Sequence, residues 1–299
     1  MDKTKIGFIG LGNLGTPIAR NLIESGYPIR IFNRTRNKVN PLIQLGATGV
    51  DTLKELAAIS GVVITLVSDD QALQEITTGP EGLLANMQPG SIHISMSTVS
   101  PELVKTLTRQ HKDAGKIYLA APIMGRPEAA RSRQLTILVA GPGESIREVD
   151  PLWQAMGASA VRVFGEEPAL ANTMKLCVNF LIASSLEALA ETYALAERSG
   201  INPHDAYELL TSTLFNCIVF KNYGKLMLDA TFQKPSFTLK LGLKDINLVL
   251  DAAALHHVSM DQGHLIKRRM QESMDKERGE WDWSAITLIA REKMDTERE

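Results

Sequence analysis

The sequence is poor in cysteine and in excess charge, and both shortages exclude classes of protein. Its 299 residues include only two cysteines, Cys177 and Cys217, too few for a fold held by several disulfide bonds. The 32 lysines and arginines are balanced by 34 aspartates and glutamates, giving a formal charge of −2. Without a cationic surplus or a basic stretch interleaved with aromatics, we expect no nucleic-acid partner.

Long hydrophobic runs are also missing. We find no segment with about 20 apolar residues, the length that a membrane-spanning helix requires. Residues 1–5 are polar and lead directly into an apolar strand pattern, whereas a secretory signal peptide needs a longer apolar core and a small-residue cleavage site. We therefore expect a cytoplasmic protein without a membrane partner, with enough apolar residues, 44%, for folded domains.

Short β-branched runs alternate with amphipathic stretches through the first half of the chain. This spacing is typical of βαβ units, whose parallel strands are covered by helices on both sheet faces. Expected helices include 14–25 and 38–45, and the expected strands are 5–10, 28–33, 62–68, 91–96, 117–121 and 135–140. Residues 62–67 show almost no polar alternation, as expected of a strand that is buried on both faces.

The second half lacks strand patterns. No glycine or internal proline interrupts residues 168–199, which predicts a helix of about 45 Å that ends at Gly200. Further helices are expected at 203–211, 217–228, 239–256, 260–277 and 283–295. The predicted fold class is α/β: an N-terminal Rossmann domain with a parallel sheet, residues 1–165, then a long interdomain helix and an all-α C-terminal domain, residues 166–299.

A glycine-rich turn follows the first expected strand and opens the first expected helix. Its sequence is Gly10-Leu11-Gly12-Asn13-Leu14-Gly15, a GxGxxG pattern in the context that dinucleotide binding requires. The glycines allow a tight turn, close approach of a pyrophosphate and close packing of helix on strand. A glycine-rich turn without a ligand is the alternative, but this context favours a cofactor site.

The end of the second expected strand indicates which dinucleotide binds. NAD sites place an acidic residue there, about 20 residues after the glycines, to accept hydrogen bonds from the ribose. This chain has Asn33-Arg34-Thr35-Arg36 instead. A guanidinium and a hydroxyl can bind a 2′-phosphate, which a carboxylate would repel. We therefore expect NADP, with a solvated basic loop as the alternative.

Three polar residues share one stripe of the long helix. Asn172, Lys175 and Asn179 lie at i, i+3 and i+7 among apolar neighbours. A lone lysine there would usually extend its ammonium to water. Two asparagines on its face, in a chain with a dinucleotide turn, favour a catalytic lysine instead. A non-catalytic NADP-binding sensor would not need this stripe, so we expect an enzyme.

Four blocks, in this order, resemble those of the β-hydroxyacid dehydrogenases, a family that includes 3-hydroxyisobutyrate dehydrogenases, with glyoxylate/succinic semialdehyde reductases and imine reductases as relatives. The resemblance covers essentially the whole chain. The blocks are Gly7 to Gly15 with Asn21-Leu22, Ser97-Thr98-Val99-Ser100-Pro101, Asn172-x-x-Lys175-Leu176-x-x-Asn179 and Leu243-Lys244-Asp245-x-x-Leu248.

The resemblance implies a fold, an activity and a set of site residues. It implies hydride transfer between NADP(H) and a small β-hydroxy acid, aldehyde or keto acid, with Lys175 as general acid/base and Asn179 binding substrate and orienting Lys175. Besides the glycine turn, the implied cofactor residues are Asn33, Arg34, Thr35, Val67, Ser68, Thr98 and Lys244. The implied substrate residues are Ser97, Met124, Gly125, Arg126, Asn179 and Asp245.

The substrate loop departs from the family pattern Ala-Pro-Val-Ser-Gly-Gly. Here it is Ala121-Pro122-Ile123-Met124-Gly125-Arg126. Arg126 could clamp a substrate carboxylate, or Met124 could line a more apolar pocket for a less polar carbonyl or an imine. Imine reduction is therefore the alternative activity, although imine reductases typically place Asp or Tyr where this chain has Lys175.

Four further expectations concern Cys177, metal binding, the pair Asp69 and Asp70, and assembly. Cys177 is expected to be a buried, inert thiol, and the scattered histidines indicate no metal site. Asp69 and Asp70 could frame the cofactor or merely start a solvated loop. The long helix has more apolar surface than one small domain can cover, and family members pair their helical domains, so we expect a homodimer or homotetramer.

Overall fold

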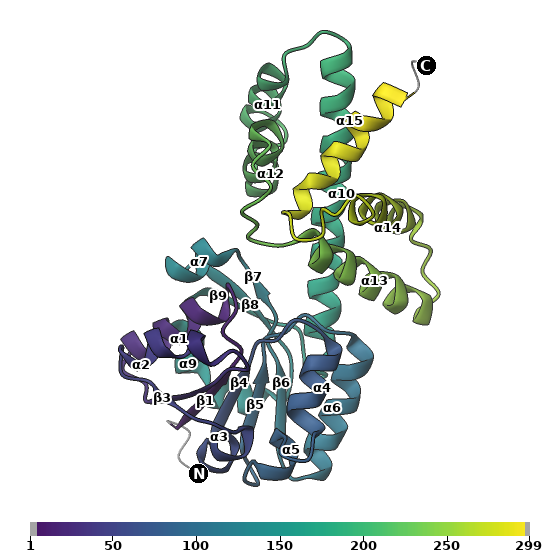
Figure 1. Cartoon of the computed structure of the whole chain (residues 1–299). Helices are drawn as coiled ribbons and strands as arrows, with labels where there is room; N and C mark the ends of the chain where they lie inside the picture. Colours follow the sequence, from purple (N-terminus) through teal and green to yellow (C-terminus); the bar gives the residue numbers. More distant parts are fainter. Residues whose placement is uncertain (1–4, 297–299) are drawn as a thin grey trace. The chain divides into compact units, whose positions relative to one another are not determined.

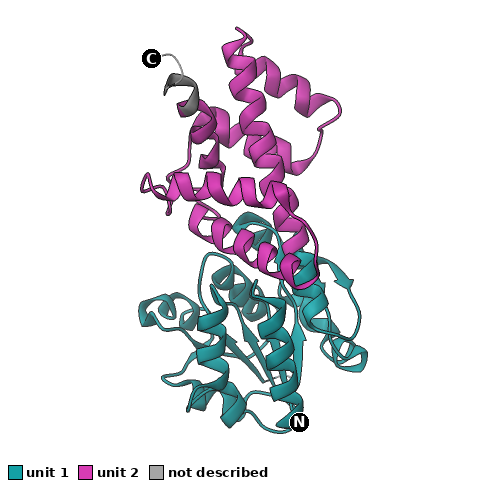
Figure 2. Ribbon diagram, turned by 90° about the vertical axis from the view of Figure 1, so that its right-hand side faces the viewer, with its two compact units in different colours: residues 1–175 teal, residues 176–299 magenta. Residues whose placement is uncertain are grey.

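The computed structural model describes residues 5–296. The chain forms two compact units, Met1–Lys175 and Leu176–Glu299 (Figure 2). The division falls inside the long helix α10 (Ala169–Arg198), so the first turns of this helix pack with the N-terminal unit.

A six-stranded parallel sheet forms the centre of the N-terminal unit (Figure 1). Its order is β3-β2-β1-β4-β5-β6, so the chain moves outward in opposite directions from β1, which is the arrangement of dinucleotide-binding folds. The strands are β1 (Ile6–Ile9), β2 (Ile29–Phe32), β3 (Thr48–Gly49), β4 (Val62–Thr65), β5 (Ile92–Ser95) and β6 (Ile117–Ala120). This confirms the Rossmann prediction.

Helices cover both faces of this sheet. Ile6 and Phe8 of β1 pack with Ile18 of α1 on one face, whereas Ile9 packs with Leu56 of α3 on the other. Because successive side chains of a strand point to opposite faces, such strands need apolar residues at every position. The helices are α1 (Gly15–Glu24), α3 (Leu53–Ile59), α4 (Asp70–Thr78), α5 (Leu83–Asn86) and α6 (Pro101–Asp113).

A second sheet of three strands follows, in the order β7-β8-β9. The prediction that residues 135–140 continue the first parallel series is wrong, because β8 pairs antiparallel with β7 and parallel with β9. The strands are β7 (Ile123–Met124), β8 (Leu135–Val139) and β9 (Ala158–Val163), with helices α7 (Pro127–Arg131), α8 (Gly143–Glu148) and α9 (Asp150–Ala155).

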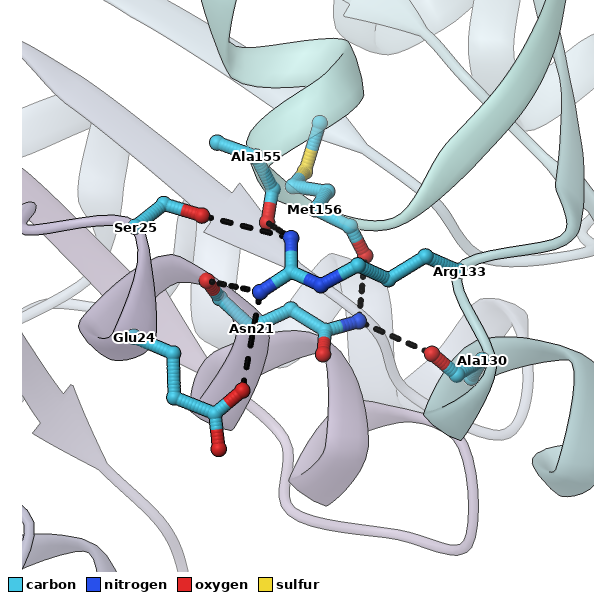
Figure 3. Close-up of polar contacts among 7 residues, drawn as sticks. All are labelled: Asn21, Glu24, Ser25, Ala130, Arg133, Ala155 and Met156. Atoms are coloured by element: carbon cyan, nitrogen blue, oxygen red, sulfur yellow. Dashed lines mark hydrogen bonds and ion pairs between the residues drawn. The ribbon is translucent and has the colours of Figure 1, made fainter.

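The buried amide of Asn21 joins α1 to α7 and to the end of α9 (Figure 3). Its Nδ2 donates to the carbonyls of Ala130, at 2.8 Å, and Met156, at 3.1 Å. Beside it, the Arg133 guanidinium donates to the Asn21 carbonyl at 3.2 Å and lies 3.5 Å from the Glu24 carboxylate. One polar cluster therefore fixes the C-terminal half of α1 against α7 and the end of α9.

The C-terminal unit is helical, with a core between α10 and the helices that follow it. Leu186 and Tyr193 of α10 pack with Ile246, Met270 and Trp283 in this core. The elements after α10 are α11 (Pro203–Ser212), α12 (Ile218–Asp229), α13 (Leu239–Leu255), α14 (Asp261–Met274), a 3₁₀ helix (Trp283–Ile286) and α15 (Thr287–Thr296).

Three predicted helices differ at their ends. The expected helix at 38–45 is a 3₁₀ turn, Arg36–Lys38, followed by α2 (Asn40–Ile43), which starts one residue before Pro41, a residue favoured in the first helical turn. The helix expected to reach 277 ends at Met274, three residues before Glu277 with its φ of 60°. The last predicted helix begins with a 3₁₀ turn instead.

The helix α10 qualifies the expectation about membranes. Among the described residues, it has the length and apolar composition of a membrane-spanning helix. The expectation that no segment reaches this length is therefore wrong as a matter of composition. A long core helix passes the same test, and 44% of the apolar window in α10 is buried inside the protein.

Candidate active site

The glycine turn between β1 and α1 has the geometry of a pyrophosphate cradle. Gly10 has a φ of 103°, and a Cβ there would lie 2.1 Å from the carbonyl oxygen of Leu66. A Cβ on Gly15 would lie 1.9 Å from the carbonyl oxygen of Gly10. At Gly12, by contrast, a Cβ would have no atom within 4 Å among the described residues. Two glycines are thus required by the fold, and the third leaves space where a ligand can approach.

The backbone N–H groups of the turn divide into two sets. The Leu11 N–H donates to Oδ1 of Asn33 at 2.8 Å, so it is already used within the protein. The N–H groups of Gly12, Asn13 and Leu14 make no hydrogen bond within residues 5–296. Since they lie at the positive end of α1, they suit an anionic pyrophosphate.

The loop after β2 lies beside the turn, and Asn33 links the two. While its Oδ1 accepts from Leu11, its Nδ2 donates to the Thr35 carbonyl at 2.8 Å. The Arg34 and Thr35 side chains are exposed, whereas Arg36 forms an ion pair with Asp51. Asn33 therefore shapes the loop, and Arg34 and Thr35 are the polar side chains next to it that could contact a ligand.

The loops after β4 and β5 are joined by side-chain hydrogen bonds. Ser97 Oγ accepts from the Val67 N–H at 2.8 Å. Asp70 accepts from the Ser100 N–H at 3.0 Å and from the Ser100 hydroxyl. These bonds hold the predicted cofactor residues Val67, Ser68 and Thr98 on two connected segments at the carboxyl edge of the sheet, where α/β folds bind ligands.

Asp69 and Asp70 have structural roles. Asp69 is the N-cap of α4, accepting from the Ala72 N–H at 2.9 Å, and it also accepts from the Ser68 hydroxyl at 2.6 Å. Asp70 binds Ser100, as described above. Both carboxylates thus have hydrogen-bond partners within the protein, unlike side chains that merely start a solvated loop.

The expected substrate loop runs from β7 into α7. Gly125 has a φ of 145°, which a residue with a side chain adopts only with strain. Arg126 occupies the N-cap position of α7 and is half-buried. Met124 is half-buried and packs against the core cluster that includes Val99 and Tyr118.

The helical unit brings three predicted site residues together. Asn179 on α10 donates through Nδ2 to Oδ2 of Asp245 on α13 at 2.5 Å. Lys244 Nζ lies 2.9 Å from Oδ1 of the same carboxylate. Asn179 and Asp245 are buried, whereas Lys244 is partly exposed. Lys175 lies one turn before Asn179 on α10, which places the amine and the amide on one helical stripe.

Sequence reasoning missed one buried polar cluster in the N-terminal unit. His93 of β5 and His111 of α6 are joined Nδ1 to Nε2 at 3.0 Å. His111 Nδ1 donates to the Leu107 carbonyl at 2.7 Å, so its Nε2 accepts from His93, and His93 Nε2 accepts from the Thr65 hydroxyl at 2.8 Å. Burial lowers the pKa of His93 well below its usual value and lowers the pKa of His111 to about 4. Both rings are therefore neutral near pH 7.

The structure places the thiol of Cys177 differently from the expectation. Cys177 is exposed, so the prediction of a buried thiol is wrong. Residue 177 lies two positions after Lys175, and an α-helix turns by about 200° over two residues, which carries its side chain to another face. Within residues 5–296, no group of three or more His, Cys, Asp or Glu side chains is arranged to hold a metal ion.

The fold and these residues define a nicotinamide-dependent oxidoreductase: a dinucleotide-binding unit is followed by a helical unit in which Lys244 approaches a buried amide–carboxylate pair. Comparisons with protein families agree. The family described as the NAD binding domain of 6-phosphogluconate dehydrogenase matches residues 5–165. The family described as NAD-binding of NADP-dependent 3-hydroxyisobutyrate dehydrogenase matches residues 169–289. The chain belongs to the β-hydroxyacid dehydrogenase family and is an enzyme of that type.

Individual relatives match over most of their length. The Bacillus subtilis oxidoreductase YfjR is 39% identical, over 94% of this chain and 98% of its own. The 2-hydroxy-3-oxopropionate reductase of Escherichia coli is 30% identical, over 83% of this chain and 84% of its own. A 3-hydroxyisobutyrate dehydrogenase structure from Salmonella typhimurium superposes with a TM-score of 0.86 at 23% identity, covering 95% and 99%. An imine reductase structure from Myxococcus stipitatus superposes with a TM-score of 0.66 at 18% identity, covering 95% of this chain and 99% of that chain.

Proposed function

We propose that this enzyme reduces a small aldehyde or keto acid with NADPH, and oxidises the matching β-hydroxy acid in reverse, with Lys175 as general acid/base. The observation that carries the proposal is the Asn179–Asp245 hydrogen bond at 2.5 Å, with Lys175 one turn away on the same helix. This hydrogen bond fixes a buried amide one helical turn from the Lys175 amine.

The chemistry assigns a task to each group. The bound nicotinamide supplies the hydride for reduction. Negative charge then develops on the carbonyl oxygen, and the Lys175 ammonium stabilises this charge and donates the proton. A lysine with an ordinary pKa near ~10.4 is protonated at neutral pH, so reduction needs no pKa adjustment. Asn179, held by Asp245, is fixed in position to hydrogen-bond the substrate and orient the amine.

The proposed preference for NADPH depends on the loop after β2. No acidic side chain occupies 33–36, and Arg34 and Thr35 are exposed beside the glycine turn. We expect Arg34→Ala to lower kcat/KM for NADPH by about 10- to 100-fold and to change kcat/KM for NADH by less than about 3-fold. Arg36→Ala is the matched control, because Arg36 is paired with Asp51. Equal losses with both cofactors would contradict the preference.

The substrate loop favours a carboxylate-bearing substrate. Arg126 is half-buried at the start of α7, and its guanidinium is the cationic group of the loop that can bind a substrate anion, whereas Met124 packs against a core cluster. Imine reduction is the second candidate, supported by the apolar Met124 in place of serine and by the likeness to imine reductase structures.

A substrate panel tests the proposal. NADPH oxidation is measured with glyoxylate, succinic semialdehyde and a cyclic imine, and NADP reduction with 3-hydroxy acids. We expect turnover of an aldehyde that carries a carboxylate. In Arg126→Ala we expect this turnover to be lost through a rise in KM. Turnover of the imine alone would replace the carbonyl assignment with the imine reductase assignment.

The helical unit supports a proposed homo-oligomer. Several large apolar side chains of this unit are more than 60% exposed in the single chain: Leu181, Leu195, Leu209, Leu214 and Ile218. Exposed apolar side chains at this density are typical of surfaces that pair with another copy. Light scattering after size exclusion is expected to give a dimer or tetramer, and a strict monomer would contradict this proposal.

A further inference from the structure

Side-chain hydrogen bonds join two loops at the carboxyl edge of the sheet into one frame. The Val67 N–H is bound to Ser97 Oγ, and Asp70 binds both the N–H and the hydroxyl of Ser100. The segment between Ser97 and Ser100 is thus held at both ends, and it contains Thr98, a proposed cofactor contact.

One side chain of α10 is bound to the middle of this frame. Asn172 is fully buried, and its Oδ1 accepts from the Val99 N–H at 3.2 Å. Asn172 lies in the first turns of α10, and Lys175 follows three residues later on the same face. Asn172, Val99 and Lys175 all belong to the N-terminal unit.

Packing alone does not explain an asparagine at this position. The α10 residues next to Asn172 that pack into the same core cluster as Val99 are Ala169 and Ala171. Their small side chains set how closely the helix approaches the cluster, but they resist rotation of the helix about its axis only weakly. A directional hydrogen bond does fix that rotation. The Asn172 Nδ2 makes no hydrogen bond within residues 5–296, which is a cost that an apolar side chain of the same size would avoid.

We propose that Asn172 is a positioning residue for Lys175. Its bond to Val99 sets the rotation of α10 relative to the cofactor loop, and thereby the direction in which the Lys175 side chain leaves the helix. Successive side chains of a helix differ in direction by about 100°. A rotation of the whole helix by a few tens of degrees therefore changes the direction of the Lys175 side chain by a substantial part of that step. This inference rests on the proposed role of Lys175.

The test compares variants that remove or keep the acceptor oxygen. Asn172→Leu and Asn172→Ala remove it, and Asn172→Asp keeps an oxygen at the same place. Thr173→Ala is the control on the same turn, because its hydroxyl donates to the Ala169 carbonyl of its own helix. For each variant, kcat and its pH profile, KM, NADPH Kd, Tm and hydrogen exchange at the Val99 amide are measured.

We expect Asn172→Leu and Asn172→Ala to lower kcat by 10-fold or more, to shift the pH profile of kcat and to speed exchange at Val99. NADPH Kd should stay within 3-fold, and Asn172→Asp should restore slow exchange and much of kcat. Should the leucine variant not fold, the alanine variant carries the same prediction.

Two outcomes overturn the inference, and they are distinguishable. If Lys175→Ala is inactive but both acceptor-deleting variants keep wild-type kcat and pH profile, the positioning role is wrong while the proposed function stands. If Lys175→Ala keeps full activity, the proposed function fails, and the positioning role fails with it.

Discussion

The amide of Asn179 donates to the carboxylate of Asp245 at 2.5 Å, joining α10 to α13 inside the helical unit. The two side chains are 4% and 1% exposed. Because Lys244 approaches the other oxygen at 2.9 Å, the carboxylate is held from two sides. A buried carboxylate in this setting requires a donor at position 179, which is why a change of one atom there should matter.

Replacing Asn179 with aspartate should place two carboxylates face to face in the interior. We expect a loss of about 3 kcal/mol in the free energy of unfolding at pH 8. The loss should be smaller at pH 5, because one carboxyl then takes up a proton in the folded state and the hydrogen bond can reform. Urea unfolding at both pH values measures this, with the exposed Thr192→Asp as control. Equal losses at the two pH values would contradict this role of Asn179.

The glycine turn predicts opposite effects at two positions. Gly12→Ala should leave Tm within about 1 °C, because nothing lies within 4 Å of the added carbon, yet raise the NADPH Kd by 10-fold or more by occupying the space of the pyrophosphate. Gly10→Ala should lower Tm by several degrees, because the added carbon meets the Leu66 carbonyl at 2.1 Å. Calorimetry and fluorescence titration with NADPH separate the two. Unchanged NADPH affinity in Gly12→Ala would place the cofactor elsewhere.

The buried histidine pair predicts loss of stability in mild acid. The folded pKa of each ring lies below the ordinary value of 6.5, so the unfolded chain takes up protons first as the pH falls. Stability is therefore fully present above pH 6.5 and declines from there toward pH 4, by about 1.4 kcal/mol per pH unit for each histidine.

Urea unfolding at intervals from pH 7.5 to 4.5 measures that slope. In His111→Gln the decline in the free energy of unfolding with falling pH should be less steep than in the wild type, by the contribution of one histidine. His204→Gln, at an exposed position, is the control and should leave it unchanged. A wild-type stability that is flat over this range would contradict the neutral, buried assignment.

The Asn21 cluster predicts an effect on stability that is separate from cofactor binding. Asn21→Ala leaves the Ala130 and Met156 carbonyls without their donor, which should cost about 2–3 kcal/mol. NADPH Kd should stay within 3-fold, because the turn lies at the other end of α1. Ser25→Ala, at the exposed rim of the cluster, should cost less than about 0.5 kcal/mol. A 10-fold loss of NADPH affinity without loss of stability would reverse this assignment.

Much of the fold follows from local patterns in the sequence. The central strands were predictable because apolar residues at every position indicate burial on both faces, and α10 because nothing interrupts it. The second sheet was not separable from the first: β7 has two residues, and β9 is half-exposed along much of its length. Pairing between such strands is decided by tertiary contacts that no local pattern contains.

The site divides in the same way. The glycine turn and the Asn172, Lys175 and Asn179 stripe could be found from spacing. The bond from Asn33 to Leu11 spans 22 residues, and the bond from Val99 to Asn172 spans 73, so neither follows from local sequence. His93 and His111 carried no usable signal, because an isolated histidine in an apolar strand or helix looks the same whether or not it has a partner.

The most direct test is the turnover of Lys175→Ala with NADPH and the best substrate of the panel, alongside its NADPH affinity. We predict that kcat falls by about 100-fold or more, the range of a lost general acid, while NADPH Kd and Tm stay near the wild-type values. Wild-type kcat in this variant would contradict the assignment of Lys175 as the proton donor.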